Sequence, residues 1–126
     1  MIQVKEIAIK RLEGCTSGEA FTVKSWKEAD ENLFLLSSTA PKDGTYDKTR
    51  FKITFENGVI YKGRYDLKHH QVEMPSLFNH VKDFVLYHAG LSKPSWLSQE
   101  KYEISLSGVD KNEYKEFARL YLGLEV

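Results

Sequence analysis

Residues 50–66 read RFKITFENGVIYKGRYD, and this stretch decides the fold. Apolar and polar residues alternate on both sides of Asn57-Gly58, a dipeptide typical of tight turns between antiparallel strands. The pattern predicts a β-hairpin with one apolar and one polar face. The apolar face would consist of Phe51, Ile53, Phe55, Val59, Tyr61, Gly63 and Tyr65.

The register of this hairpin follows from keeping its two faces separate. A two-residue turn would pair Phe55 with Ile60 and would mix apolar and basic residues on one face. A loop of three residues, 56–58, pairs Phe55 with Val59 instead and keeps the faces apart. We therefore expect the longer loop, with Gly58 in the left-handed region and a bulge at that glycine.

Two further strands are expected before the hairpin. Residues 3–12 carry apolar residues among charged ones, and their imperfect alternation predicts a strand with a bulge near Lys5-Glu6. Residues 14–18 are typical of a turn, and residues 21–23 alternate as a second, short strand.

Helical spacing of apolar residues predicts three helices. The first begins at Ser25, with Glu28 completing a capping box, and is stopped by Pro41. The second runs from a Ser76 cap to about Ala89, and the third begins at Asp110. The expected buried stripes are Trp26, Ala29, Leu33 and Leu36 in the first, Leu77, Val81, Phe84, Val85 and His88 in the second, and Tyr114, Phe117, Ala118 and Tyr121 in the third.

Residues 98–105 fit either a short helix or a strand, because Ile104 and Leu106 also alternate. Together the elements predict a single α+β domain over residues 1–126, an antiparallel sheet of about four strands with a central hairpin. Three to four helices would pack mainly on one face of that sheet. His88, in the middle of its stripe, is expected to be a hydrogen-bonded core residue.

Composition excludes several classes of protein. The 126 residues include 18 Lys+Arg and 18 Asp+Glu, a net charge of zero, which argues against a polybasic nucleic-acid coat and against an acidic DNA mimic. One cysteine, Cys15, excludes an internal disulfide. The longest run without a charged residue, 32–41, is far shorter than the ~20 residues of a membrane span. With no secretory signal at residues 1–6, we expect a soluble, cytoplasmic protein.

Motifs for catalysis, cofactors or metals are missing from the sequence. It has no phosphate loop, no dinucleotide fingerprint and no nucleophile elbow. His80 and His88 are ~12 Å apart along a helix, too far to share one metal ion. Cys15 has no evident base beside it, so it is expected to be inert. We expect no cofactor, no metal and no enzyme; the rival hypothesis is an acid/base group made of Asp43, Asp47 and Asp66.

The polar face of the hairpin is the informative surface. Its candidate binding residues are Lys48, Arg50, Lys52, Lys62, Arg64 and Lys68. In the chosen register Lys52 faces Lys62 and Arg50 faces Arg64, like-charge arrangements that destabilise a sheet. Either this is an ordinary exposed face neutralised by Glu6 or Glu19, or it docks an acidic protein patch or a nucleic-acid backbone. Of the nearby Tyr46, Tyr61 and Tyr65, the last two fall on the apolar face, so a base-stacking platform is not supported.

Two strings carry a family resemblance: Ala40-Pro41 followed by Tyr46-Asp47-Lys48, and Tyr61-Lys62-Gly63-Arg64-Tyr65-Asp66-Leu67. With Trp26, Ala29, Leu33, residues 51–55, Gly58 and His80, they make residues 20–95 similar to one of the large polyvalent-protein-associated domains of phages and conjugative elements. The resemblance implies a protein carried by mobile DNA, with no catalytic residue to transfer. The strings also place Arg64 near Asp47 or Asp66, in an ion-paired corner that fixes the hairpin.

These observations predict a small non-enzymatic binding protein of a mobile genetic element. It would be a counter-defence inhibitor of the anti-CRISPR or antirestriction type, docking through the basic hairpin face. Its partner would be a host or defence-system complex with an acidic or nucleic-acid-binding surface. The alternative is a nucleic-acid-binding accessory protein of a phage or conjugative plasmid, which would bind nucleic acid weakly. No membrane partner is expected, and the sequence specifies no oligomeric state.

Overall fold

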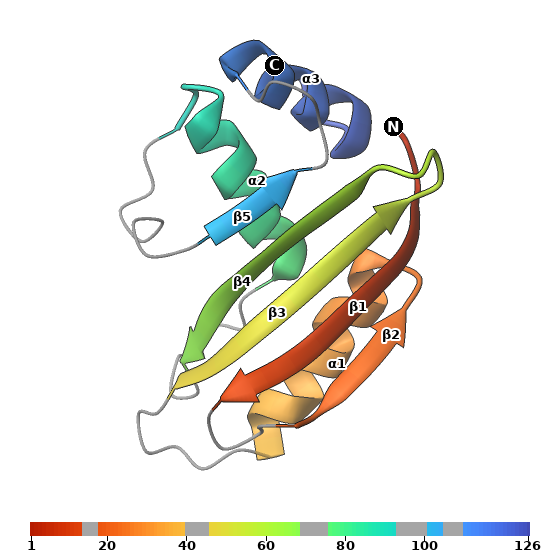
Figure 1. The fold of residues 1–126 in the computed structure, drawn as a ribbon, viewed down its shortest axis with the longest axis vertical. Helices are drawn as coiled ribbons and strands as arrows, with labels where there is room; N and C mark the ends of the chain where they lie inside the picture. Colours follow the sequence, from red (N-terminus) through yellow and green to blue (C-terminus); the bar gives the residue numbers. More distant parts are fainter. Residues whose placement is uncertain (14–17, 40–45, 69–75, 93–100, 105–109) are drawn as a thin grey trace.

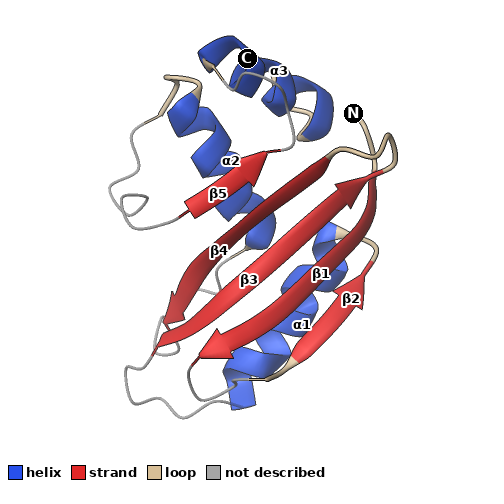
Figure 2. Cartoon of the chain, in the orientation of Figure 1, coloured by secondary structure: helices blue, strands red, loops and turns tan. Residues whose placement is uncertain are grey.

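The computed structural model describes residues 1–13, 18–39, 46–68, 76–92, 101–104 and 110–126. Its strands are β1 (Val4–Glu13), β2 (Ala20–Val23), β3 (Tyr46–Phe55), β4 (Ile60–Lys68) and β5 (Lys101–Ile104). Its helices are α1 (Trp26–Thr39), α2 (Leu77–His88) and α3 (Lys111–Tyr121). The strands form one antiparallel sheet in the order β2-β1-β3-β4-β5, with the helices on one side of it (Figures 1 and 2). The predicted α+β class is confirmed, with one strand more than the approximate number expected.

The hairpin has the predicted register. Ile53 pairs with Tyr61, and the Phe55 amide donates to the Val59 carbonyl at 2.9 Å. Gly58 has φ +89°, the left-handed value that this loop requires. The Asn57 side chain accepts a hydrogen bond from the Val59 amide at 3.2 Å and donates to the Tyr121 hydroxyl at 2.7 Å. The turn is therefore held both by its own side chain and by α3.

β1 lies between β2 and β3 and pairs with both. The predicted bulge is present: Val4 faces Phe55 while Glu6 faces Thr54, which leaves Lys5 as the extra residue. A second irregularity lies between Arg11 and Glu13. β2 and β3 lie on opposite sides of β1, so the connection from β2 to β3 must pass over β1. Helix α1 lies in that connection (Figure 1).

The predicted caps hold the helix starts. Ser25 accepts from the Glu28 amide at 3.1 Å, and Glu28 reaches back to the Lys24 amide at 3.3 Å. Ser76 and Asp110 are the N-caps of α2 and α3. An acid of α1, Asp30, also accepts from the Leu77 amide at 2.7 Å and the Ser76 hydroxyl at 3.0 Å. The start of α2 is thereby tied to α1.

The core fills the space between the sheet and the helices. Ile53, Phe55 and Tyr61 of the hairpin are fully buried. Phe55 makes an edge-to-face contact with Tyr121 of α3, with ring centroids 4.6 Å apart, and Tyr61 lies 5.4 Å from Phe117. The predicted core residues Leu33, Phe51, Val81, Phe84 and Phe117 are buried as well, and Trp26 is half-buried.

The structure decides one open alternative and corrects one expectation. Of the helix and the strand considered for residues 98–105, residues 101–104 form strand β5, because the outer edge of β4 offers backbone partners to them. His88 is not a core residue: it is exposed at the last position of α2, where its ring stacks on Tyr114 at 5.1 Å. His80 is instead the buried histidine of that helix, one turn from both Leu77 and Phe84.

Candidate functional site: the basic outer face of the sheet

The face of the sheet turned away from the helices is basic. Strand alternation sends Phe51 and Tyr61 inward, so their neighbours Arg50, Lys52 and Lys62 project outward and are exposed. The pairing predicted from the sequence is confirmed, since Lys52 lies opposite Lys62 and Arg50 opposite Arg64. Like charges thus meet across the strands, at a separation of about 5 Å between backbones.

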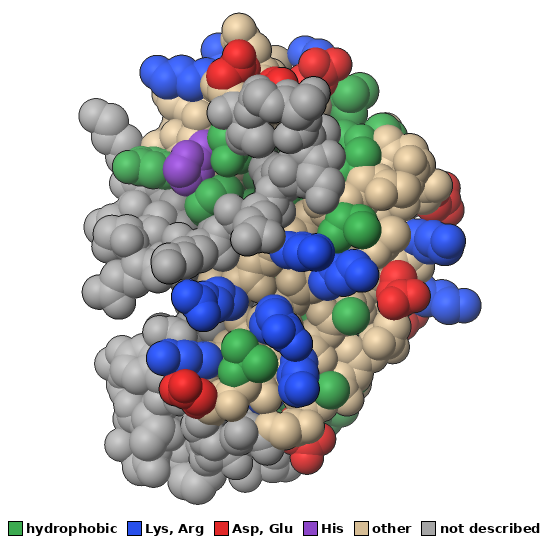
Figure 3. Space-filling model, viewed as in Figure 1, with side chains coloured by type: hydrophobic (Ala, Val, Ile, Leu, Met, Phe, Trp, Pro, Cys, Tyr) green, Lys and Arg blue, Asp and Glu red, His purple; other side chains and the backbone are tan. Residues whose placement is uncertain are grey.

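β1 extends this surface with a cation that the sequence analysis missed. Lys10 is exposed and lies opposite Arg50, which itself lies opposite Arg64. One row of basic side chains therefore crosses β1, β3 and β4. In Figure 3 the Lys and Arg side chains gather over the middle of this face, while acidic side chains lie toward its margins. We call the set Lys10, Arg50, Lys52, Lys62 and Arg64 the basic face.

The alternation of residues 3–12 places Lys10 on the outer side of its strand, but the pairing of that strand with β3 is not local. The sequence therefore indicates that residues 3–12 form a strand, but it does not indicate which strand lies beside them. A local hairpin can be read from its turn, whereas β1 and β3 are joined only through β2 and α1. For that reason Lys10 could not be assigned to the surface from sequence.

Lys48 and Lys68, at the ends of the predicted set of basic residues, differ from the residues in its middle. Lys48 forms an ion pair with Glu13 of β1, with Nζ and Oε2 3.3 Å apart. The acids expected to neutralise the face were Glu6 and Glu19, but Glu6 lies opposite Thr54. Among the side chains that the structure describes, no acid forms an ion pair with the basic face. Lys68 ends β4, and its side chain lies outside the described part of the chain.

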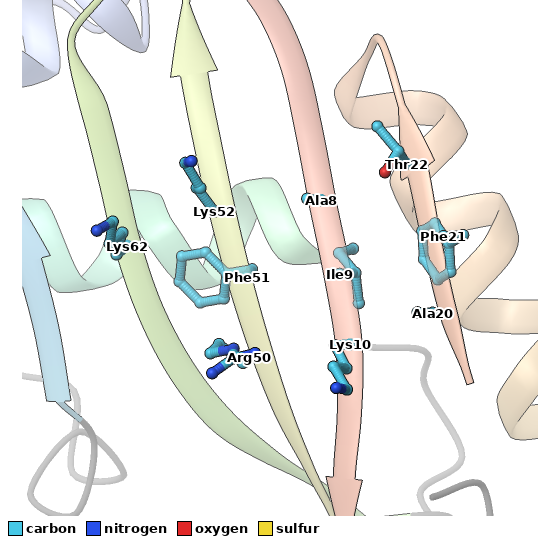
Figure 4. A pocket seen from close by; sticks show the side chains of 10 residues that line it. All are labelled: Ala8, Ile9, Lys10, Ala20, Phe21, Thr22, Arg50, Phe51, Lys52 and Lys62. Atoms are coloured by element: carbon cyan, nitrogen blue, oxygen red, sulfur yellow. The ribbon is translucent and has the colours of Figure 1, made fainter. Parts of the chain in front are cut away.

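An open hollow of about 550 Å³ lies on this same surface. Figure 4 shows Lys10, Arg50, Lys52 and Lys62 along it, and the outward positions of β1 and β2 supply small side chains. These small residues are Ala8, Ala20 and Thr22. The cations therefore border a low, uncharged floor on one side.

Most of the remaining chemical candidates lie outside the described part of the chain. Cys15 and Asp43 lie outside the described part of the chain, and so do the side chains of Asp47 and Asp66. The acid/base hypothesis and the ion-paired Arg64 corner consequently remain predictions. Where side chains are described, no three His, Cys, Asp or Glu residues lie close enough together to hold a metal ion. No described helix has the length and apolar character needed to cross a membrane.

Comparison with known proteins gives no assignment. A scan against protein-family models matches no family. Searches of curated proteins and of solved structures also find no match. The chemistry of this surface is therefore the basis for proposing a function.

Proposed function

We propose that the protein is a non-enzymatic binding protein whose basic face docks an anionic macromolecular partner. The observation that carries this proposal is the row Lys10, Arg50 and Arg64 on three adjacent strands. Like charges opposite one another destabilise the free sheet. Glu103 of β5 holds the register position opposite Lys62, but no described side chain forms an ion pair with the basic face, so the arrangement fits a surface whose charges are neutralised on binding.

The biological setting of the proposal comes from the family resemblance. Proteins carried by mobile DNA meet host defences, and small ones inhibit them by binding. We therefore propose a counter-defence inhibitor of the anti-CRISPR or antirestriction type, acting in the bacterial cytoplasm. Its partner would be a defence-system complex with an acidic surface, or one that presents the same charge pattern as nucleic acid.

The test is affinity capture from a host lysate that contains the defence systems. Wild-type protein is compared with the variant Lys52→Glu/Lys62→Glu, which should retain its fold and lose the captured partner. The matched control is Lys27→Glu/Lys115→Glu, which makes the same charge change on exposed positions of α1 and α3. Equal capture by all three proteins would contradict the proposal.

The alternative, a nucleic-acid-binding accessory protein, gives a different result in the same experiment. A partner held through phosphates should be released steeply as salt rises, because each neutralised phosphate releases counterions. Nuclease treatment should then also abolish capture. A partner that survives nuclease and weakens only modestly with salt is a protein.

A further inference from the structure

The outer face of the sheet is divided into a cationic half and a small-residue half. In one row across the sheet, Thr22 lies opposite Ala8, Ala8 opposite Lys52, and Lys52 opposite Lys62. In the next row the order is Ala20, Lys10, Arg50 and Arg64. Long cationic side chains therefore stand on β3 and β4 and at Lys10 of β1, and short ones lie on β2 and at Ala8 of β1. This difference in side-chain length creates the hollow of about 550 Å³.

The hollow is suited to a part of the partner that is bulky and uncharged. Ala8, Ala20 and Thr22 present methyl groups to it and leave room above the sheet, while the cations stand at one side (Figure 4). The cations are all exposed, as expected of a surface that a large partner covers; a small-molecule site would enclose most of its ligand.

Building on the proposed docking function, we infer that the partner contributes a protein segment combining acidic residues with one bulky apolar side chain. The acids lie over Lys52, Lys62 and Arg50, and the apolar side chain fills the hollow above Ala8 and Thr22. Bulky apolar or aromatic anchors in a pocket, with charges around them, are a common arrangement at the centre of protein interfaces.

A nucleic acid fits this surface less well. A duplex backbone offers phosphates to the cations but nothing apolar to the hollow. A single strand offers bases, yet the outward residues that line the hollow include no aromatic side chain on which a base could stack. The neutral net charge of the chain also weakens non-specific attraction to phosphates.

The experiment selects random peptides from a display library on the immobilised full-length protein. Four proteins are used: wild type, Lys52→Glu/Lys62→Glu, Thr22→Trp and Thr54→Trp. Thr22→Trp fills the hollow without changing charge. Thr54→Trp is the control, because it lies on the same face but does not line the hollow. Thermal melts check that every variant is folded.

The inference predicts that wild type enriches peptides with Asp or Glu beside one bulky apolar residue. A synthetic peptide from that set should bind Thr22→Trp about tenfold more weakly or worse, corresponding to ~1.4 kcal/mol, and bind Thr54→Trp as it binds wild type. Replacing its bulky residue by Ala should cost at least as much.

Other results would overturn the inference. Enriched peptides that are acidic but lack an apolar anchor, and that bind both Trp variants equally, would remove the hollow from the interface while leaving the docking function intact. A duplex DNA oligonucleotide that binds wild type more tightly than any selected peptide would assign the face to nucleic acid. If wild type enriches nothing beyond Lys52→Glu/Lys62→Glu, the peptide-segment inference is overturned, and the docking function is decided separately by capture.

Discussion

The two faces of the sheet come from the same strands, but the inner face buries a cation whereas the outer face exposes several. On the inner face Arg11 is fully buried, and its guanidinium donates to the Thr49 hydroxyl at 2.9 Å. On the outer face Arg50 stands exposed between Lys10 and Arg64. A buried charge without a partner is far more costly than an exposed one, so the buried guanidinium of Arg11 needs hydrogen-bond partners on the inner face. The outer face can instead hold exposed cations at a modest cost, and we propose that a partner neutralises them.

The largest expected effect is on the inner face. Phe55→Ala should lower the free energy of unfolding by about 3–5 kcal/mol, because Phe55 is fully buried against rings of α3. Denaturant titration measures it. Phe34→Ala, at a side chain 51% exposed on α1, is the control and should change stability by less than ~0.5 kcal/mol. Similar losses in both variants would contradict the assignment of the core.

The next effect concerns the loop 56–58, which sets the register of the hairpin and thereby decides which side chains face the core. Gly58→Val should destabilise the protein by ~1–3 kcal/mol, because a β-branched residue is strained at φ +89°. A Cβ at this position would meet nothing within 4 Å, so the cost is one of backbone conformation and not of collision. Gly58→Asn should cost less, since Asn tolerates the left-handed region. Thermal melts that rank Asn below Val in stability would contradict this explanation.

A smaller effect on stability should differ in sign between Lys52, in the middle of the outer face, and Lys48, at its end. Lys52→Glu should stabilise the free protein by a few tenths to ~1 kcal/mol, because it converts a like-charge pair with Lys62 into an attractive one. Lys48→Glu should slightly destabilise it, because Lys48 already pairs with Glu13. Both variants change the net charge equally. Shifts of the same sign in melting temperature would show that local pairing does not govern this face.

The smallest effect is expected at His88, the last residue of α2. Partial burial of the His88 ring beside Tyr114 of α3 lowers the pKa of His88 from its ordinary 6.5. As pH falls below 6.5, the unfolded chain takes up this proton before the folded one, so the free energy of unfolding falls until the folded pKa is passed. His88→Gln should reduce this pH dependence. Urea titrations of both proteins on either side of pH 6.5 measure it, and identical profiles would refute it.

Local signals made much of the fold predictable. The Asn57-Gly58 turn with its flanking alternation determined the hairpin register, and the Ser76 and Asp110 caps marked two helix starts. The core position predicted for His88 is wrong, because the apolar stripe of α2 continues to its last residue, which lies beyond the core. Residues 98–105 fit both a helix and a strand, because the edge of β4 that pairs with residues 101–104 is far away in sequence.

The candidate site was predictable to the same extent as the strands that carry it. Four members of the basic face lie on the hairpin and were assigned from its register. Lys10 and the small-residue floor belong to β1 and β2, whose place beside β3 depends on non-local pairing. The hollow therefore became visible only when those strands were assembled, since no string in the sequence brings Ala8 next to Lys52.

The most direct test of the account is the free energy of unfolding of Arg50→Glu at low ionic strength. Arg50 has a basic neighbour on each side, Lys10 and Arg64, so reversing it replaces two repulsive pairs by two attractive ones. We predict that Arg50→Glu is more stable than wild type, by more than Lys52→Glu is, and that added salt diminishes the difference. A less stable Arg50→Glu would show that these cations stabilise the free protein, and would contradict the claim that they are present for binding.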